Sequence, residues 1–158
     1  MSDKPSSVGP QAVVERFCAA MSEDVPTLAA LMDDDYLRFG AETGWSPMTK
    51  TKYVKMAENF KQPFPDVRWD IQDLVVGRNQ VAVDLVESGT FTAPWSVRDV
   101  TIEPNGGRYE MRGAVFFTVN DKGLISRYTY INTGAFTGYY ADVLNDDFYI
   151  AYANEFLA

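Results

Sequence analysis

The stretch RYEMRGAVFFTVNDKGLISRYTYIN (residues 108–132) decides the fold. Two runs of alternating apolar and polar residues flank NDKG (residues 120–123), which is a strong hairpin turn signal. The second run places Tyr128, Tyr130 and Asn132 on one strand face. Two phenols and an amide on a face that should be buried are either polar tips on core residues or the lining of a ligand pocket.

Periodic patterns of apolar residues earlier in the chain predict the remaining elements. Apolar residues recur at helical spacing in the first third of the chain, and a two-residue period prevails after residue 67. The predicted helices cover residues 10–21, 26–32 and 48–60, and the other predicted strands cover residues 36–39, 67–76 and 81–91. Helices followed by long antiparallel strands predict an α+β fold, in which a curved antiparallel sheet packs around the N-terminal helices and leaves a pocket on its concave face.

The chain of 158 residues is predicted to form one domain. Residues 1–10 are expected to be a flexible lead-in, and residues 11–136 the domain body. The aromatic segment 137–158 is too apolar for a free tail, so it should pack over the pocket mouth or across a subunit interface.

Composition excludes several functions. The net charge of −8 argues against nucleic-acid binding, and no apolar run suggests a membrane span or signal segment, so a cytoplasmic location is expected. The chain has no histidine and one cysteine, Cys18, which removes histidine bases and the usual zinc ligands. We therefore expect no metal or organic cofactor, and acid–base chemistry must rely on carboxylates or tyrosines.

The segments VVERFCAAM, GWSPMTKTKYVKMAENFKQPFPDVRWDIQDLVV, VAVDLVESGTFTAP and RGAVFFTVNDKGLISRYTYINTG carry a resemblance to a known family. Over residues 11–136 the chain resembles the SnoaL-like branch of the nuclear-transport-factor-two-like superfamily. The resemblance implies a cone with a deep apolar pocket, usually in a homodimer. Members include polyketide cyclases, limonene-type epoxide hydrolases, steroid isomerases and non-catalytic binding modules.

The resemblance also implies how the site departs from the family pattern. Cyclase-like members carry a tryptophan and, four positions later, an acid–base aspartate on the last strand, and these positions hold Tyr128 and Asn132 here. The arginine and acid of the epoxide hydrolases correspond to Leu85 and Glu87, so the acid is kept and the arginine is missing. A frequent histidine position holds Phe91.

Glu87 is the main catalytic candidate. It interrupts the more apolar face of its strand, where loss of solvation should raise its pKa toward that of a general base. The alternative is a glutamate near a strand end that reaches water. Tyr130 and Asn132 are the accessory candidates, which could hold an oxygen where charge develops.

Six further residues are predicted to contact a substrate: Phe39, Leu85, Phe91, Met111, Val115 and Tyr128. Arg38 could reach the pocket from the first strand, but it is expected at the surface. The predicted activity is cofactor-independent cyclisation or isomerisation of a hydrophobic oxygenated molecule such as a polyketide or terpenoid. A non-catalytic binding module and an epoxide hydrolase remain alternatives. A homodimer is expected through the outer sheet face, which Ala114 and Phe116 make partly apolar.

Overall fold

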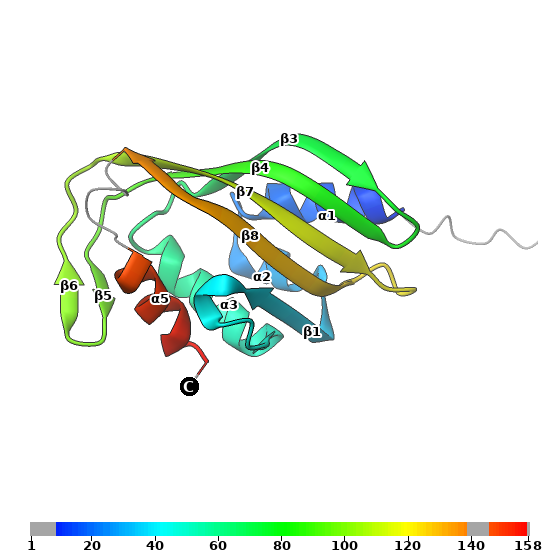
Figure 1. Ribbon diagram of the computed structural model, residues 1–158, viewed down its shortest axis with the longest axis horizontal. Coiled ribbons are helices and arrows are strands. Elements are labelled where there is room, and N and C mark those ends of the chain that lie inside the picture. Colours follow the sequence, from blue (N-terminus) through cyan, green and yellow to red (C-terminus); the bar gives the residue numbers. More distant parts are fainter. Residues whose placement is uncertain (1–8, 139–145, 158) are drawn as a thin grey trace, which may run out of the picture.

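A computed structural model describes residues 9–138 and 146–157; the side chains of Val97 and of residues 132–138 and 146–150 lie outside this description. The expected lead-in therefore falls almost wholly outside it, as do residues 139–145 of the expected extension. Figure 1 shows a long, strongly twisted sheet with helices against one face.

Three helices precede most of the sheet: α1 (Pro10–Ala20), α2 (Val25–Ala29) and α3 (Lys50–Lys61). Pro10 starts α1, where its missing N–H costs nothing, and the side chain of Asp24 caps α2 by accepting from the Thr27 N–H at 2.7 Å. The apolar positions that predicted α1, such as Val13 and Phe17, are buried. Their stripe faces the sheet, as expected from the spacing.

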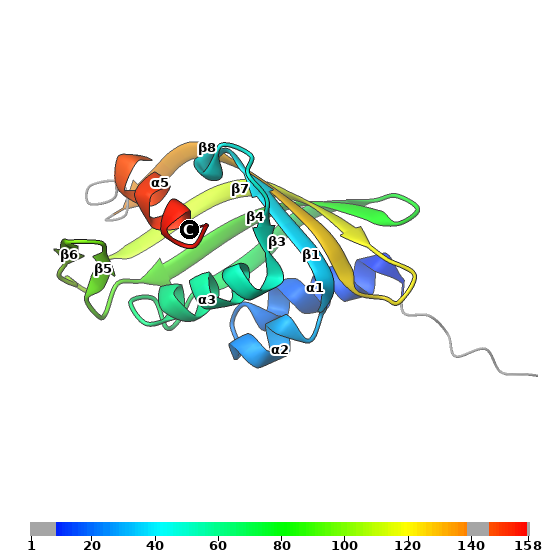
Figure 2. The same cartoon turned by 90° about the horizontal axis from the view of Figure 1, so that it is seen from below.

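The main sheet has the strand order β2-β1-β8-β7-β4-β3. Its strands are β1 (Met32–Gly40), β2 (Met48–Thr49), β3 (Arg68–Val76), β4 (Gln80–Thr90), β7 (Arg108–Val119) and β8 (Ile125–Gly138). A short hairpin of β5 (Trp95–Val97) and β6 (Val100–Ile102) forms a second sheet. Viewed from below in Figure 2, the helices α1, α2 and α3 cover the same face of the main sheet.

The α+β fold with a curved sheet and N-terminal helices is confirmed, and the β7–β8 hairpin is present. Gly123 adopts φ 74° in the turn, and the Asn120 N–H donates to the Leu124 carbonyl at 2.9 Å. The sheet is not wholly antiparallel, because β1 runs parallel to β8. This pairing brings residues nearly one hundred positions apart side by side, which no local pattern could indicate.

The first strand is also longer than the sequence predicts, because β1 starts at Met32 rather than at residue 36. Its acidic start is tied to the β7–β8 turn, where the Asn120 side chain donates to the buried Asp33 carboxylate at 2.9 Å. Because the buried residue here is a charged aspartate, hydrophobicity alone does not show where the strand begins.

After the undescribed residues 139–145, helix α5 (Asp146–Glu155) lies beside β5 and the short 3-10 helix η1 (Ala41–Thr43). Side-chain hydrogen bonds from its described residues attach it to the body. The Tyr152 hydroxyl donates to the Met56 carbonyl at 3.0 Å, and the Asn154 amide donates to the Glu42 carbonyl at 2.8 Å. This helix brings Tyr152 into contact with the interior.

Candidate active site

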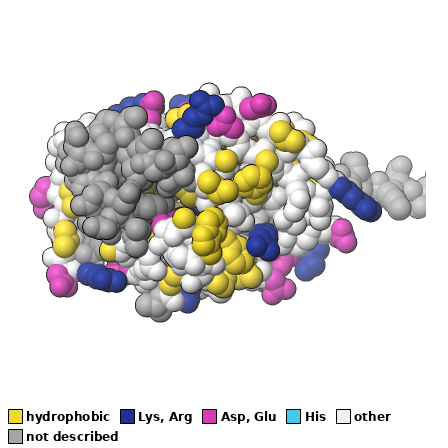
Figure 3. All heavy atoms as spheres, in the orientation of Figure 1, with side chains coloured by type: hydrophobic (Ala, Val, Ile, Leu, Met, Phe, Trp, Pro, Cys, Tyr) yellow, Lys and Arg dark blue, Asp and Glu magenta, His cyan; other side chains and the backbone are white. Residues whose placement is uncertain are grey.

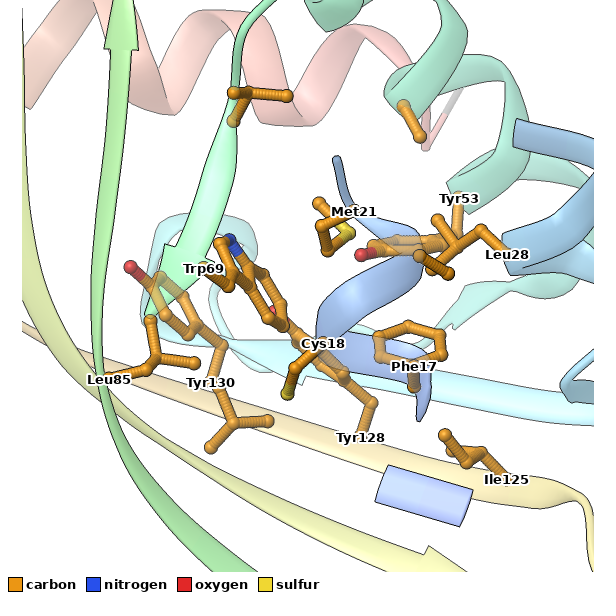
Figure 4. Close-up of a cluster of buried hydrophobic side chains, with 14 of the residues drawn as sticks. Phe17, Cys18, Met21, Leu28, Tyr53, Trp69, Leu85, Ile125, Tyr128 and Tyr130 are labelled. Atoms are coloured by element: carbon orange, nitrogen blue, oxygen red, sulfur yellow. The ribbon is translucent and has the colours of Figure 1, made fainter. Parts of the chain in front are cut away.

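A cavity of about 60 Å³ lies between the concave face of the sheet and the helices. Its wall is mostly aromatic and aliphatic, with one carboxylate and one guanidinium. The lining residues are Met21, Arg38, Tyr53, Met56, Ala57, Phe60, Trp69, Glu87, Tyr128, Tyr130 and Tyr152. In Figure 4, Trp69 lies between the Tyr128 and Tyr130 side chains on one side and Met21 on the other, and the Tyr130 ring points toward Leu85.

Glu87 reaches the cavity because of the alternation that the sequence shows along β4. Val83 and Leu85 precede it on the same face, and both are buried. The predicted facing of Glu87 toward the interior is therefore confirmed. The strand register supplies its environment, since Glu87 pairs with Trp69 of β3 on one side and Met111 of β7 on the other.

Two hydrogen bonds hold the Glu87 carboxylate. The Trp69 indole N–H donates to Oε2 at 2.7 Å, and the Tyr109 hydroxyl donates to Oε1 at 2.7 Å. Loss of solvation raises the pKa of Glu87 above its ordinary value, and this effect exceeds the lowering by the two hydrogen bonds and by the charge of Arg38. The carboxyl is oriented and made more basic, which suits a proton acceptor.

The alternation along β8 left open whether its tyrosines are core residues or pocket lining. Tyr128 and Tyr130 are both buried, and both line the cavity. The Tyr130 hydroxyl donates to Met111 Sδ at 3.5 Å. A thioether is a weak acceptor, so this hydroxyl can be redirected to a better acceptor at little cost. The backbone of Asn132 pairs with Gly113, while its side chain lies outside the described residues.

Arg38 corrects the expectation of a surface arginine. Its side chain is 2% exposed, lines the cavity and pairs with Glu42, whose side chain is 7% exposed. Its guanidinium carbon lies 5.5 Å from the centroid of the Tyr128 ring and 5.9 Å from that of Tyr130. Arg38 lies two residues after Tyr36, so both side chains share the inward face of β1. This two-residue spacing was the sequence signal that could have placed Arg38 inside.

Phe39 was predicted to line the pocket, and this placement is wrong. As the neighbour of an inward residue on a strand, it points to the outer face, where the Arg127 guanidinium carbon lies 4.4 Å from its ring centroid. The inward position on this part of β1 belongs to Arg38, which lines the cavity.

Four other predicted contact residues are buried on the concave side without reaching the cavity: Leu85, Phe91, Met111 and Val115. They form the layer behind its wall. Phe91, for example, stacks on Phe64 with 5.3 Å between ring centroids. A substrate in this cavity would meet them only after rearrangement of the lining side chains.

The sequence did not single out Trp69 and Tyr109 as donors to Glu87, or Tyr152 of α5 as part of the wall. Each interaction joins separate elements, and the three aromatic residues are unremarkable in local patterns. Within the described residues, no group of three or more acidic or cysteine side chains is placed to hold a metal ion. The described helices are all too short or too polar to cross a membrane.

A curved sheet that closes with helices around a largely apolar cavity defines the nuclear-transport-factor-two-like class. Within it, the SnoaL-like domain model matches residues 14–128, so the chain belongs to the SnoaL-like family. A search of curated proteins finds no significant match.

Solved structures share this fold at low sequence identity. AclR of Streptomyces galilaeus, a candidate hydroxylase, has a TM-score of 0.68 at 15% identity over 78% of this chain and 74% of its own. IdmH of Streptomyces antibioticus, a candidate polyketide cyclase, has a TM-score of 0.65 at 22% identity over 78% and 91%. A candidate SnoaL-like polyketide cyclase of Jannaschia sp. CCS1 has a TM-score of 0.65 at 14% identity over 84% and 91%. At these identities the likeness establishes the fold.

Proposed function

We propose that this protein is an enzyme of the cyclase or isomerase type that acts on a hydrophobic, oxygenated small molecule such as a polyketide or terpenoid intermediate. Glu87 is the proton-transfer group, Tyr130 and Asn132 assist it, and no metal or organic cofactor takes part. The observation that carries the proposal is an oriented carboxylate of raised pKa in the wall of an apolar cavity.

The site suits proton removal from a carbon next to a carbonyl. The Glu87 carboxylate accepts the proton, and the C–H electron pair moves into the carbonyl to give an enolate. The enolate carbon can then attack a second carbonyl of the same molecule, which forms a ring, and the alkoxide that results takes the proton back from Glu87. Alternatively, Glu87 can return the proton to another carbon, which moves a double bond.

Tyr130 lines the same cavity as Glu87 and can assist this reaction. Its hydroxyl can leave the weak sulfur acceptor of Met111 and donate to the developing oxyanion. Asn132 follows two positions later on β8 and would supply an amide to the same oxygen or to a water. The family membership and the candidate cyclases among the structural neighbours fit this class of reaction.

A non-catalytic binding module is the second candidate, because Asn132 stands at the position of the family's acid–base aspartate and an amide cannot exchange protons. The cavity of about 60 Å³ is small, since a cavity that binds benzene has roughly 150 Å³. A polyketide would therefore have to displace lining side chains. Met21 and Met56 in the wall are flexible enough to repack around such a ligand.

Proton transfer can be tested without the native substrate. Purified protein should speed deuterium exchange at the methyl group of acetophenone in D2O, followed by NMR. Glu87→Gln should lower the enzymatic rate by about a hundredfold or more, because an amide cannot accept the proton. Glu110→Gln, which changes an exposed glutamate on β7, is the matched control and should retain the rate. Equal rates for wild type and Glu87→Gln would refute the catalytic role and favour the binding module.

A further inference from the structure

We propose that Arg38 binds the oxyanion together with Tyr130 and that its charge selects carbonyl compounds whose oxygen becomes negatively charged. The inference rests on the proposed function, because the charge on that oxygen arises when Glu87 removes a proton. Among the described residues that line the cavity, Arg38 is the sole cation. A buried guanidinium in a largely apolar wall can stabilise negative charge on the oxygen of a bound ligand.

Residues from several elements hold the Arg38 side chain in place. Glu42 in η1 pairs with Arg38 across the turn that follows β1. A Cβ at Gly40 would meet the Glu42 carboxylate, which would then have to shift from its place beside Arg38. The carbonyl of Glu42 accepts from Asn154, which fixes η1 against α5.

The aromatic rings of β8 complete the support. The guanidinium lies within 6 Å of the ring centroids of Tyr128 and Tyr130, a distance at which ring faces attract a cation. Arg38 is thus held on one side by a carboxylate and on another by two rings. Such a restrained cation loses little freedom when it binds an oxygen, which is the condition for effective charge stabilisation.

The charges of the wall explain why an enolate fits. The field of Arg38 already reaches Glu87, since it lowers the pKa of that carboxyl. When Glu87 takes a proton from carbon, the negative charge leaves the carboxylate and appears on the substrate oxygen, so the total charge in the cavity is unchanged. Arg38 then stabilises the oxygen instead of the carboxylate.

The test compares the binding of two small aromatic compounds by calorimetry. Every protein in it, including the one that is wild type at Arg38 and Glu42, also carries Glu87→Gln, because the neutral amide stands for the acid that has taken the proton and leaves no second negative charge beside the ligand. 4-Nitrophenol, at a pH at which it is ionised, carries an anionic oxygen conjugated to a double bond, as an enolate does. Nitrobenzene has nearly the same shape without that oxygen. The protein with Arg38 and Glu42 intact should bind the phenolate about tenfold more tightly or better, as expected for a charge-assisted contact.

The preference should disappear in Arg38→Met/Glu42→Gln, which removes the buried ion pair together so that neither charge is left alone. Arg127→Met is the matched control, because it removes an arginine from the opposite face of the same sheet and should keep the preference. Circular dichroism establishes that each variant is folded. Should the double variant fail to fold, Glu42→Gln alone gives the answer, since it frees more of the Arg38 charge and should tighten phenolate binding.

Three results would overturn the proposal: no preference for the phenolate in the protein with Arg38 and Glu42 intact, a preference that survives in Arg38→Met/Glu42→Gln, or unchanged phenolate affinity in Glu42→Gln. These results are separate from the fate of the proposed function, because phenolate binding involves no proton transfer from carbon. If Glu87→Gln abolishes ketone exchange while the affinity for the phenolate does not depend on Arg38, the enzyme proposal stands and the oxyanion role of Arg38 is refuted. The reverse pattern would leave an anion-binding pocket without the catalysis.

Discussion

At the scale of single residues, the chemistry of this protein depends on how Glu87 is surrounded. Burial makes the charged carboxylate less stable, while Trp69 and Tyr109 each donate a hydrogen bond that makes it more stable. The loss of solvation has the larger effect, so the pKa of Glu87 rises. The balance can be shifted by removing one donor.

Tyr109→Phe removes one of the bonds to the Glu87 carboxylate, so the pKa of Glu87 should rise further. Because the base acts only when deprotonated, the exchange rate of acetophenone increases as the pH rises through this pKa. In Tyr109→Phe the midpoint of the pH–rate profile should therefore move to higher pH than in the wild type.

Tyr53→Phe is the control for this shift, because it removes a hydroxyl from the same cavity that interacts with Tyr128 and is not one of the two donors to Glu87. Its midpoint should stay close to that of the wild type. A Tyr109→Phe midpoint that moves to lower pH, or does not move, would contradict the assigned role of the hydrogen bond.

At the scale of elements, the position of Tyr109 depends on how closely β4 and β7 approach each other at Gly89. A Cβ at Gly89 would lie 3.0 Å from a ring carbon of Tyr109 and 3.4 Å from Cβ of Phe64. Both neighbours are buried, so neither can simply move into solvent.

Gly89→Ala should therefore destabilise the fold by about 1–3 kcal/mol, the usual cost of overpacking, as measured by urea denaturation. Gly77→Ala is the matched control, because the nearest atom to its added Cβ is the Gln80 carbonyl oxygen at 3.4 Å and the position is exposed. An effect of Gly89→Ala no larger than that of Gly77→Ala would show that the interface has more room than the contacts indicate.

Helix α5 controls the size of the cavity, because Tyr152 is buried and forms part of the wall. Tyr152→Ala should open this side and favour larger ketones. The ratio of the exchange rate of 2-acetylnaphthalene to that of acetophenone should increase. Tyr152→Phe keeps the ring, loses the bond to the Met56 carbonyl, and should leave the ratio near that of the wild type. A ratio unchanged in Tyr152→Ala would mean that ligands reach Glu87 by another side.

At the scale of the whole molecule, the outer face of the sheet remains partly apolar. Phe116 is 49% exposed and Ile131 is 46% exposed. Phe116 also borders a groove of about 310 Å³ that β3, β4, β7 and β8 share. Figure 3, in the orientation of Figure 1, shows hydrophobic side chains gathered on part of the molecular surface.

We propose that two copies pair through this outer face to form a homodimer. Phe116→Glu should then give a monomer by sedimentation velocity at micromolar concentration, because a charge without a partner opposes burial. Val100→Glu, at an exposed valine of the β5–β6 hairpin, should leave the dimer intact. A monomeric wild type would refute the dimer without affecting the catalytic proposal.

The sequence by itself determined the elements and several of the inward faces. Periodicity is local, so it located α1, the β7–β8 hairpin and the inward side of β4, and it placed Glu87, Tyr128 and Tyr130 correctly toward the interior. Carboxylates had to be the catalytic candidates because the chain has no histidine.

Only the tertiary structure decided which groups surround Glu87. The parallel pairing of β1 with β8, the donors Trp69 and Tyr109, and the contribution of Tyr152 join segments far apart in the chain. Arg38 was misplaced for a related reason: a charged residue turns inward only where a partner such as Glu42 offsets its desolvation, and that partner comes into reach through the turn after β1. Local patterns report which face of an element is buried, whereas pairing between elements determines what lies opposite.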